Sequence, residues 1–236
     1  QSVNAVAVTP DGRRAVSGGG DRTLRVWNLV TGQNERTLTG HTAGVLFVAV
    51  TSDGRRAVFG GKDRTLRVWN LDTGEREFTL IGHTGRVQAV AVMPDGQRVI
   101  SGGSDGTVRV WNLDTGKVER TLAGHAGRVN AVTVTLDGQR AVSGGEDGML
   151  RVWNLHSGQR ERSLTGHIDW ILTMAATSNG WRAVSGGKDR TLRVWNLNTG
   201  QSEFTLTGHR GWVRDVAVSP NGRRGVSGGG DGTLRV

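Results

Sequence analysis

Short stretches of alternating apolar and polar residues recur along the chain. Residues 86–92, Arg-Val-Gln-Ala-Val-Ala-Val, alternate with a period of two, which predicts a half-buried β-strand. A turn signal, Pro-Asp-Gly at 94–96, follows it. Three more short strands are predicted after it, each preceded by a turn, at residues 98–101, 108–111 and 119–122. No stretch keeps a 3.6-residue apolar period long enough for a helix, so the pattern predicts small sheets of four antiparallel strands.

This pattern returns every 42 residues without insertion or deletion. A Trp-Asn pair marks the end of each third strand, at Trp27, Trp69, Trp111, Trp153 and Trp195. A Gly-His pair precedes the first strands, at His41, His83, His125, His167 and His209. Such a period is typical of repeat proteins, and four-stranded sheets repeated radially form a β-propeller. The predicted fold class is therefore all-β, a propeller of four-stranded antiparallel blades.

The chain carries six first strands but only five fourth strands. It is 16 residues short of six complete units, so we expect one outer strand to be missing from the last blade. Residues 1–236 are predicted to form a single domain. Six blades are favoured, but a piece of a larger ring and an assembly of several chains stay open. An open strand position also invites pairing with another chain, so self-association through the incomplete blade is an alternative. The sequence begins inside a repeat at Gln1, so we expect it to belong to a longer protein.

These residues resemble the WD40-repeat family over the whole chain. The Gly-His pair, the turn Asp and the third-strand Trp stand at the family's spacing, with Asn in place of the family's second Asp. The resemblance implies a buried hydrogen-bond chain of His, Ser, Asp and Trp in each blade. The matching sets are His83, Ser101, Asp105 and Trp111; His125, Ser143, Asp147 and Trp153; and His167, Ser185, Asp189 and Trp195. The second unit departs from the pattern, because Phe59 stands where the Ser is expected.

Composition and motifs argue against several other kinds of site. Because the His, Ser and Asp sets recur in every unit, they are interpreted as structural, and no catalytic residue is predicted. Cysteine is absent and no local His pair has metal-ligand spacing, so neither a metal nor a cofactor is expected. The Gly-rich turns join strand to strand and therefore do not predict a phosphate loop. No run of 18 apolar residues exists to cross a membrane. The absence of cysteine favours an intracellular compartment, and a cytoplasmic location is expected.

Positions that vary between the units are the candidates for binding, because the fold does not need them to be constant. One series at the entrance to the first strand reads Ser2, Gly44, Arg86, Arg128, Trp170 and Trp212. The position two residues further on includes Arg214, and the position before the turn Asp includes Lys62, Glu146 and Lys188. By the family's geometry these series lie around the mouth of the central channel. The predicted partner-binding residues are Arg86, Arg128, Trp170, Trp212 and Arg214, since Trp and Arg dominate binding energetics. Neutral variation of the surface is the competing interpretation.

The predicted function is a non-catalytic interaction or scaffold module that binds a protein or peptide, in particular an acidic one. The repeats resemble those of bacterial multidomain signalling proteins, which is an analogy of fold. Formal net charge is +9, and this leaves nucleic-acid binding through basic faces as the alternative. Nucleic acid is the less favoured partner, because many of the arginines recur at fixed repeat positions, as packed or solvated side chains do.

Overall fold

The computed structural model describes residues 2–219 and 221–236, and every regular element in that part of the chain is a β-strand. The strands form six consecutive antiparallel sheets, five of four strands and a last one of three. The fold is therefore the six-blade, all-β propeller that the repeat predicts. The last sheet lacks its fourth strand, as the count of repeats also predicts. The chain divides into two compact units: residues 1–105 with 109–121, and residues 106–108 with 122–236.

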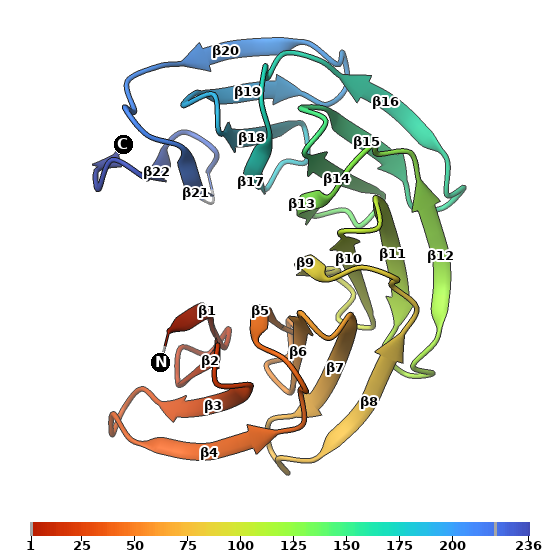
Figure 1. The fold of residues 1–236 in the computed structure, drawn as a ribbon, viewed down its shortest axis with the longest axis vertical. Helices are drawn as coiled ribbons and strands as arrows, with labels where there is room; N and C mark the ends of the chain where they lie inside the picture. Colours follow the sequence, from red (N-terminus) through yellow and green to blue (C-terminus); the bar gives the residue numbers. More distant parts are fainter. Residues whose placement is uncertain (1, 220) are drawn as a thin grey trace. The chain divides into compact units, whose positions relative to one another are not determined.

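The N-terminal unit holds the first three blades (Figure 1). Its sheets follow the chain order, so each strand pairs with the next one along the sequence. The first blade consists of β1 (Val3–Val8), β2 (Arg14–Gly19), β3 (Thr23–Asn28) and β4 (Asn34–Thr39). The second consists of β5 (Val45–Val50), β6 (Arg56–Gly61), β7 (Thr65–Asn70) and β8 (Arg76–Ile81). The third consists of β9 (Val87–Val92), β10 (Arg98–Gly103), β11 (Thr107–Asn112) and β12 (Val118–Ala123).

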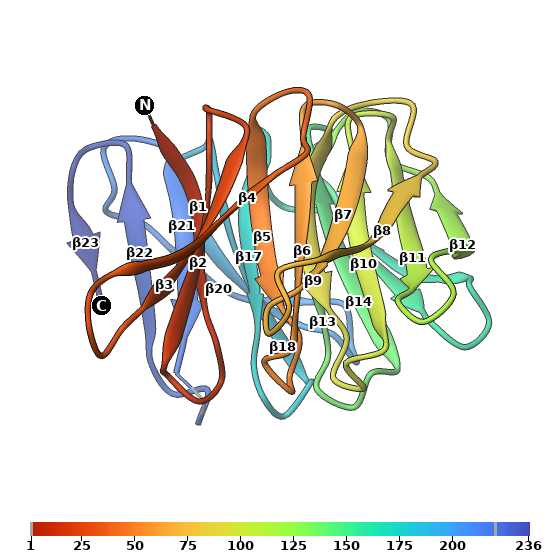
Figure 2. The ribbon, with the colours of Figure 1, turned by 90° about the horizontal axis from the view of Figure 1, so that it is seen from below.

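The C-terminal unit holds the other three blades, again in chain order. The fourth blade consists of β13 (Val129–Val134), β14 (Arg140–Gly145), β15 (Leu150–Asn154) and β16 (Arg160–Leu164). The fifth consists of β17 (Ile171–Ala176), β18 (Arg182–Gly187), β19 (Leu192–Asn196) and β20 (Ser202–Leu206). The sixth consists of β21 (Val213–Val218), β22 (Gly225–Gly229) and the short β23 (Leu234–Arg235), which lies at the sheet edge in Figure 2.

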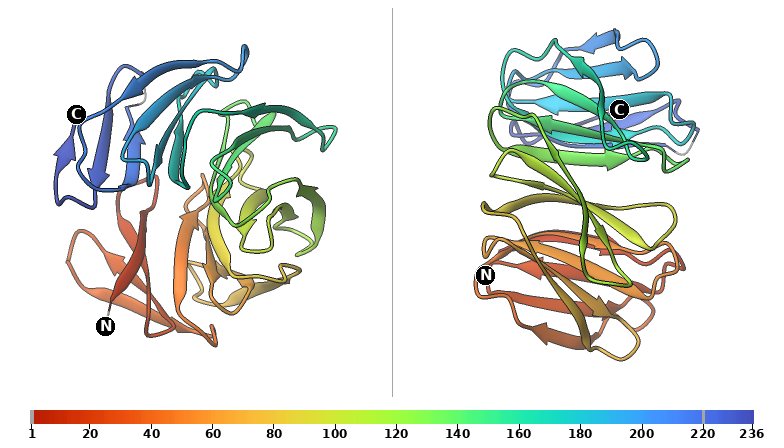
Figure 3. Two further views of the ribbon diagram at one scale, coloured as in Figure 1. Left: turned by 45° about the horizontal axis from the view of Figure 1, so that its top comes forward. Right: turned by 90° about the vertical axis from the view of Figure 1, so that its right-hand side faces the viewer.

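Each blade is strongly twisted and packs face to face against the next blade of its unit. In Figure 2, β4 runs across the direction of β1 within the first sheet, as the right-handed twist of strands requires. In the right-hand view of Figure 3, the red, orange and yellow sheets of the N-terminal unit lie one against another. The first strands β1, β5 and β9 are neighbours in that order, and so are β13, β17 and β21 in the other unit.

The glycine pair that ends each second strand allows these sheets to approach closely. A Cβ on Gly60 would lie 2.6 Å from Cγ1 of Val87, and one on Gly144 would lie 2.6 Å from Cγ2 of Ile171. Any larger residue at these positions would push the next blade outwards. These glycines belong to the ends of the second strands and not to the turns that the sequence predicts there, and their role is structural, in packing between blades.

The hydrophobic core lies between consecutive blades of each unit, and three of its layers contain a Trp and a Leu from a Trp-Asn-Leu sequence. In the C-terminal unit, Val142, Leu150, Val152 and Leu164 of the fourth blade pack against Trp195 and Leu197 of the fifth. In the N-terminal unit, the second blade's Val58, Leu66, Val68 and Leu80 pack in the same way against Trp111 and Leu113. In the second, third and fifth blades, the Trp-Asn-Leu sequence at the end of the third strand therefore supplies two large apolar side chains to the layer before its own blade.

Candidate functional site

The His, Ser, Asp and Trp sets lie together inside the blades, as the resemblance implies. In the third blade, the Trp111 indole N–H donates to Ser101 Oγ at 2.8 Å, and Ser101 Oγ lies 2.8 Å from His83 Nε2. His83 Nδ1 is 2.9 Å from an Asp105 carboxylate oxygen. Indole is only a donor, so a consistent chain has Ser101 donating to Nε2 and Nδ1–H donating to the carboxylate. This arrangement uses a neutral imidazole.

The other two predicted sets repeat this geometry in the C-terminal unit. The distance from Ser Oγ to His Nε2 is 2.7 Å in both, and the indole N–H donates to the same oxygen at 2.8 Å. The three Ser residues are completely buried. The same hydrogen-bond chain occurs at the same buried position in three blades, and this repetition supports a structural role.

The second blade shows what the departure at position 59 does. Phe59 is completely buried and packs in the apolar layer between the first two blades. Among the described residues, His41 Nε2 and Trp69 Nε1 have no hydrogen-bond partner, although both atoms are buried. The phenyl ring of Phe59 therefore adds apolar contact where the other blades have a hydroxyl, and it leaves a donor and a ring nitrogen unpaired.

The ring nitrogens of these histidines lead to a prediction about pH. Burial lowers the pKa of His83, His125 and His167, although the neighbouring carboxylates oppose this shift. The unfolded chain therefore takes up protons near the ordinary histidine pKa of about 6.5, and the folded protein does so only at lower pH. We expect the melting temperature to fall as the pH is lowered from about 7.5 to about 5.5. Thermal unfolding followed by circular dichroism would measure this.

A second decrease is expected at more acidic pH. Hydrogen bonds from His125 and His167 lower the pKa of Asp147 and Asp189 against the opposing effect of burial, so protonating these carboxyls destabilises the fold. A melting temperature that stayed constant between pH 7.5 and 5.5 would contradict neutral, buried imidazoles.

Three of the five predicted binding residues belong to one set of contacts in the C-terminal unit, in which Lys188 lies over two Trp rings and Arg214 over one of them. Lys188 Nζ is 3.2 Å from the centroid of the Trp170 ring and 4.6 Å from that of the Trp212 ring. The guanidinium carbon of Arg214 is 5.6 Å from the Trp212 ring. The indole side chain of Trp212 is 46% exposed, and Arg214 is exposed as well. We call Trp170, Lys188, Trp212 and Arg214 the tryptophan–lysine cluster.

The backbone holds this cluster in place from two blades. The amide N–H of Lys188 donates to the carbonyl of Trp170 at 2.8 Å, and that of Gly230 donates to the carbonyl of Trp212 at 2.7 Å. Each Trp directly precedes the first strand of its blade, and its carbonyl is held by the backbone N–H of the residue before the turn Asp. A lysine between two indole faces is attracted by both ring quadrupoles. The cluster therefore presents a rigid aromatic surface with two positive charges.

The other predicted residue of the C-terminal unit, Arg128, has a partner on its own blade. Arg128 Nε lies 3.5 Å from a Glu146 carboxylate oxygen. Arg86 is exposed and belongs to the N-terminal unit. Lys188 was not among the five predicted residues, although the variable position before the turn Asp contained it. The five-residue assignment stays a prediction.

No group of three or more His, Cys, Asp or Glu side chains within residues 2–219 and 221–236 is arranged to hold a metal ion. Nor do those residues contain a helix long and apolar enough to span a membrane.

A comparison with protein-family models identifies the repeat. The model described as "WD40: WD domain, G-beta repeat" matches residues 1–28, 32–70, 74–112, 116–154, 158–196 and 200–236. These six segments cover nearly the whole chain. The first holds β1 to β3, and each later segment holds the fourth strand of one blade and the first three strands of the next.

Proposed function

Because the chain belongs to the WD40-repeat family, whose propellers commonly serve as protein-interaction scaffolds, we propose that it is a non-catalytic module that binds a protein or peptide. The proposed binding surface is the tryptophan–lysine cluster. The observation that carries the proposal is Lys188 held between the indole rings of Trp170 and Trp212. A cytoplasmic scaffold that serves attached signalling domains is the setting we propose for this binding, by analogy with the regular repeats.

The chemistry of the cluster favours an acidic ligand with apolar side chains. Trp and Arg are the residues that contribute most to binding energy at protein interfaces. The ammonium of Lys188 and the guanidinium of Arg214 would attract a carboxylate, while the indole of Trp212 offers an exposed apolar surface. Ile168 is 90% exposed two residues before Trp170 and would extend the apolar part of the surface. Since the cluster is ordered by its own contacts, little side-chain entropy would be lost on binding.

Many arginines that give the chain its charge are engaged within the protein, which disfavours nucleic acid as the partner. Arg67 and Arg151 are buried beside the turn carboxylates of their own blades, at 3.7 Å from Asp63 and 2.7 Å from Asp147. Arg14, Arg56, Arg140 and Arg182 form ion pairs or hydrogen bonds with acidic or amide side chains at the opposite end of the second strands. The net charge therefore overstates the basic surface that is free to meet phosphates.

Selection from a library of displayed random peptides would test the proposal. We expect the chain to enrich peptides rich in Asp and Glu, and the double variant Trp170→Ala with Trp212→Ala to bind them about 30-fold or more weakly, because each Trp truncation removes a hot-spot side chain. Fluorescence anisotropy with the enriched peptides would give the dissociation constants. The melting temperature of the double variant should change little, because the cluster lies at the surface. The loss of affinity would then be a loss of binding contacts and not of folded protein.

Trp181 provides the matched control, because it is 63% exposed in the turn between β17 and β18 and lies outside the cluster. Trp181→Ala should bind the peptides as the parent does. Equal affinity of the parent and the double variant would rule out the cluster as the binding surface. A labelled oligonucleotide that bound more tightly than the peptides, with a steep dependence on salt, would favour the nucleic-acid alternative instead.

A further inference from the structure

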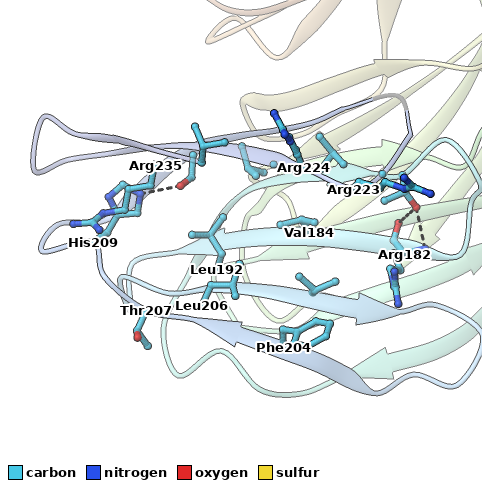
Figure 4. Close-up of a pocket in the computed structure, with 18 residues that line it drawn as sticks. Arg182, Val184, Leu192, Phe204, Leu206, Thr207, His209, Arg223, Arg224 and Arg235 are labelled. Carbon is cyan, nitrogen blue, oxygen red and sulfur yellow. Dashed lines mark hydrogen bonds between the residues drawn. The ribbon is translucent and has the colours of Figure 1, made fainter.

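In five blades, the Arg of the third strand lies against the Gly of a Gly-His pair. In the second blade this residue is Arg67 on β7, and a Cβ on Gly40 would lie 2.6 Å from Arg67 Nη1. Figure 4 shows the counterpart in the sixth blade, where Arg235 lies near His209 and a Cβ on Gly208 would be 3.0 Å from Arg235 Nη1. Because Gly has no side chain, it leaves space for the guanidinium.

Arg67 is buried in this space with hydrogen-bond donors unused. Its side chain is 9% exposed, and its ion pair with Asp63 is long, at 3.7 Å. Among the described residues, the buried Nε of Arg67 has no hydrogen-bond partner. The Asp63 carboxylate instead accepts from the His41 ring, the amide of Thr42, and the amide and hydroxyl of Thr65. The carboxylate that stands beside Arg67 is therefore already engaged.

A second guanidinium, that of Arg76, reaches the same place from β8. The Cβ position on Gly40 lies 3.6 Å from Arg76 Nη1, so both Arg side chains come within 4 Å of one point. Arg76 is exposed, and it forms no hydrogen bond or ion pair within residues 2–219 and 221–236. Burial lowers the pKa of Arg67, and the nearby charge of Arg76 lowers it as well, although Asp63 opposes both effects. Two positive charges are therefore held close together at the surface of the second blade.

The pairing of β7 with β8 adds a hydroxyl group to the same face of the sheet. Arg67 stands opposite Thr79, and Trp69, two residues from Arg67, stands opposite Arg76. Opposite residues of an antiparallel pair share a face of the sheet, and so do residues two apart on one strand. The half-buried Thr79 has no hydrogen-bond partner for its hydroxyl in the described part of the chain. We call Arg67, Arg76 and Thr79 the second-blade arginine site.

The acid next to Arg76 on β8 does not neutralise this site. Glu77 pairs with Arg56 at 2.7 Å and accepts from Asn70 Nδ2 at 3.1 Å. These partners belong to the end of the blade where Arg56 also binds Asp114. The positive charge of the second-blade arginine site is therefore open to a ligand.

Comparison with other blades shows what distinguishes the second one. In the first, third and fifth blades the position of Arg76 holds an uncharged residue, namely Asn34, Val118 and Ser202. The fourth blade has Arg160 there, and a Cβ on Gly124 would lie 3.6 Å from Arg160 Nη1 and from Arg151 Nε. Arg151, however, donates to Asp147 at 2.7 Å, so its charge is matched within the protein. The second blade thus combines a pair of guanidinium groups with a buried Arg that lacks such a bond.

We propose that the second-blade arginine site binds a phosphate-type oxyanion, a tetrahedral dianion supplied as free phosphate or as a phosphate monoester. Two guanidinium groups present planar N–H forks to two of its oxygens, and the Thr79 hydroxyl donates to a third. A dianion also offsets the repulsion between Arg67 and Arg76 more fully than a single carboxylate does. The tryptophan–lysine cluster belongs to the other unit and takes no part, so the inference stands apart from the proposed function.

Isothermal titration calorimetry of the whole chain with inorganic phosphate, at constant ionic strength, would test the site. We expect saturable binding with a dissociation constant of about 1 mM or lower. Arg76→Gln should weaken binding about 10-fold or more, because it removes one of the two charge-assisted donors. Arg76→Lys should weaken it less, since the ammonium keeps the charge but not the fork. Thr79→Val, which removes the hydroxyl at nearly constant volume, should weaken binding about 3-fold.

Arg160→Gln is the matched control, because it removes the Arg at the same repeat position beside a guanidinium that Asp147 already engages. It should bind phosphate as the parent does. The double variant Trp170→Ala with Trp212→Ala should also bind phosphate as the parent does, which separates this test from that of the proposed function. The buried Arg67 is tested without substitution. In NMR spectra of protein with isotope-labelled arginine, phosphate should shift a slowly exchanging Nε–H signal, and Arg76→Gln should abolish this shift.

A comparison of ligands identifies the source of the oxyanion. Tighter binding of O-phosphoserine than of inorganic phosphate assigns the site to a phosphate monoester, and the reverse order assigns it to free phosphate. Three results would overturn the proposal. The first is phosphate that fails to saturate the chain at about 10 mM. The second is acetate that binds as tightly as phosphate at the same ionic strength. The third is an Arg160→Gln variant that loses as much affinity as Arg76→Gln.

Discussion

Replacing Trp195 with alanine is expected to lower the free energy of unfolding by about 3–5 kcal/mol. The side chain is completely buried, and it fills the layer between the fourth and fifth blades against Val142, Leu150 and Leu164. Its removal leaves a cavity and takes away the donor that Ser185 Oγ accepts at 2.8 Å. Urea unfolding, followed by circular dichroism and by tryptophan fluorescence, would measure the loss.

Trp181→Ala is the control for that measurement, because the same residue type is removed from an exposed turn. It should change the free energy of unfolding by less than about 0.5 kcal/mol. Comparable losses in the two variants would mean that Trp195 is not the packing element the structure describes. The two spectroscopic transitions should also coincide in the parent, since repeat arrays can unfold in steps.

Replacing Asp189 with alanine is expected to cost about 3 kcal/mol, the second largest effect. Its side chain is 2% exposed and accepts hydrogen bonds from His167 Nδ1 at 2.7 Å and from the hydroxyl and amide of Thr191. Ile168 N–H, at 3.3 Å, is a further donor to it. Alanine would leave these donors unpaired beside a buried ring, which costs more than a surface ion pair contributes.

Asp72→Ala is the matched control, because Asp72 is half exposed and forms a surface ion pair with Arg14. It should cost at most about 1 kcal/mol. If Asp189→Ala were as mild as Asp72→Ala in urea unfolding, the hydrogen-bond chain would contribute little to the fold. Asp189→Asn should lie between the two, since an amide oxygen can still accept from the backbone N–H groups.

The fold could be predicted from sequence because its signals are repeated. Period-two strands and glycine turns recur in one register, so each strand assignment is supported by four or five others. The packing of Trp195 against the preceding blade follows from the same register, since only one face of each third strand can meet that layer. The hydrogen-bond chains followed from the resemblance, and their distances confirm it.

The contacts of the variable residues could not be predicted in the same way. Trp170, Lys188 and Trp212 are far apart in sequence, and the direction of each side chain depends on rotamers that the repeat does not constrain. Arg128 is an example, because its guanidinium lies beside the Glu146 carboxylate of the same blade. The sequence shows that Phe59 stands where the other units have Ser. It does not show that His41 Nε2 and Trp69 Nε1 are buried without a hydrogen-bond partner.

The close similarity of the layers between blades has a consequence for how the chain reaches its structure. The Trp-Asn-Leu sequences present the same two apolar side chains to layers of similar residues, so during folding a strand could dock against the wrong neighbour. Contacts that differ between layers distinguish the correct neighbour from a wrong one. Arg56 binds Asp114, whereas Arg140 binds Asn198, and Phe59 packs in the layer between the first two blades. Near-identical repeats carry a risk of misassembly between neighbouring units. The small irregularities of this array are therefore the contacts by which correct docking of a blade differs from docking on the wrong neighbour.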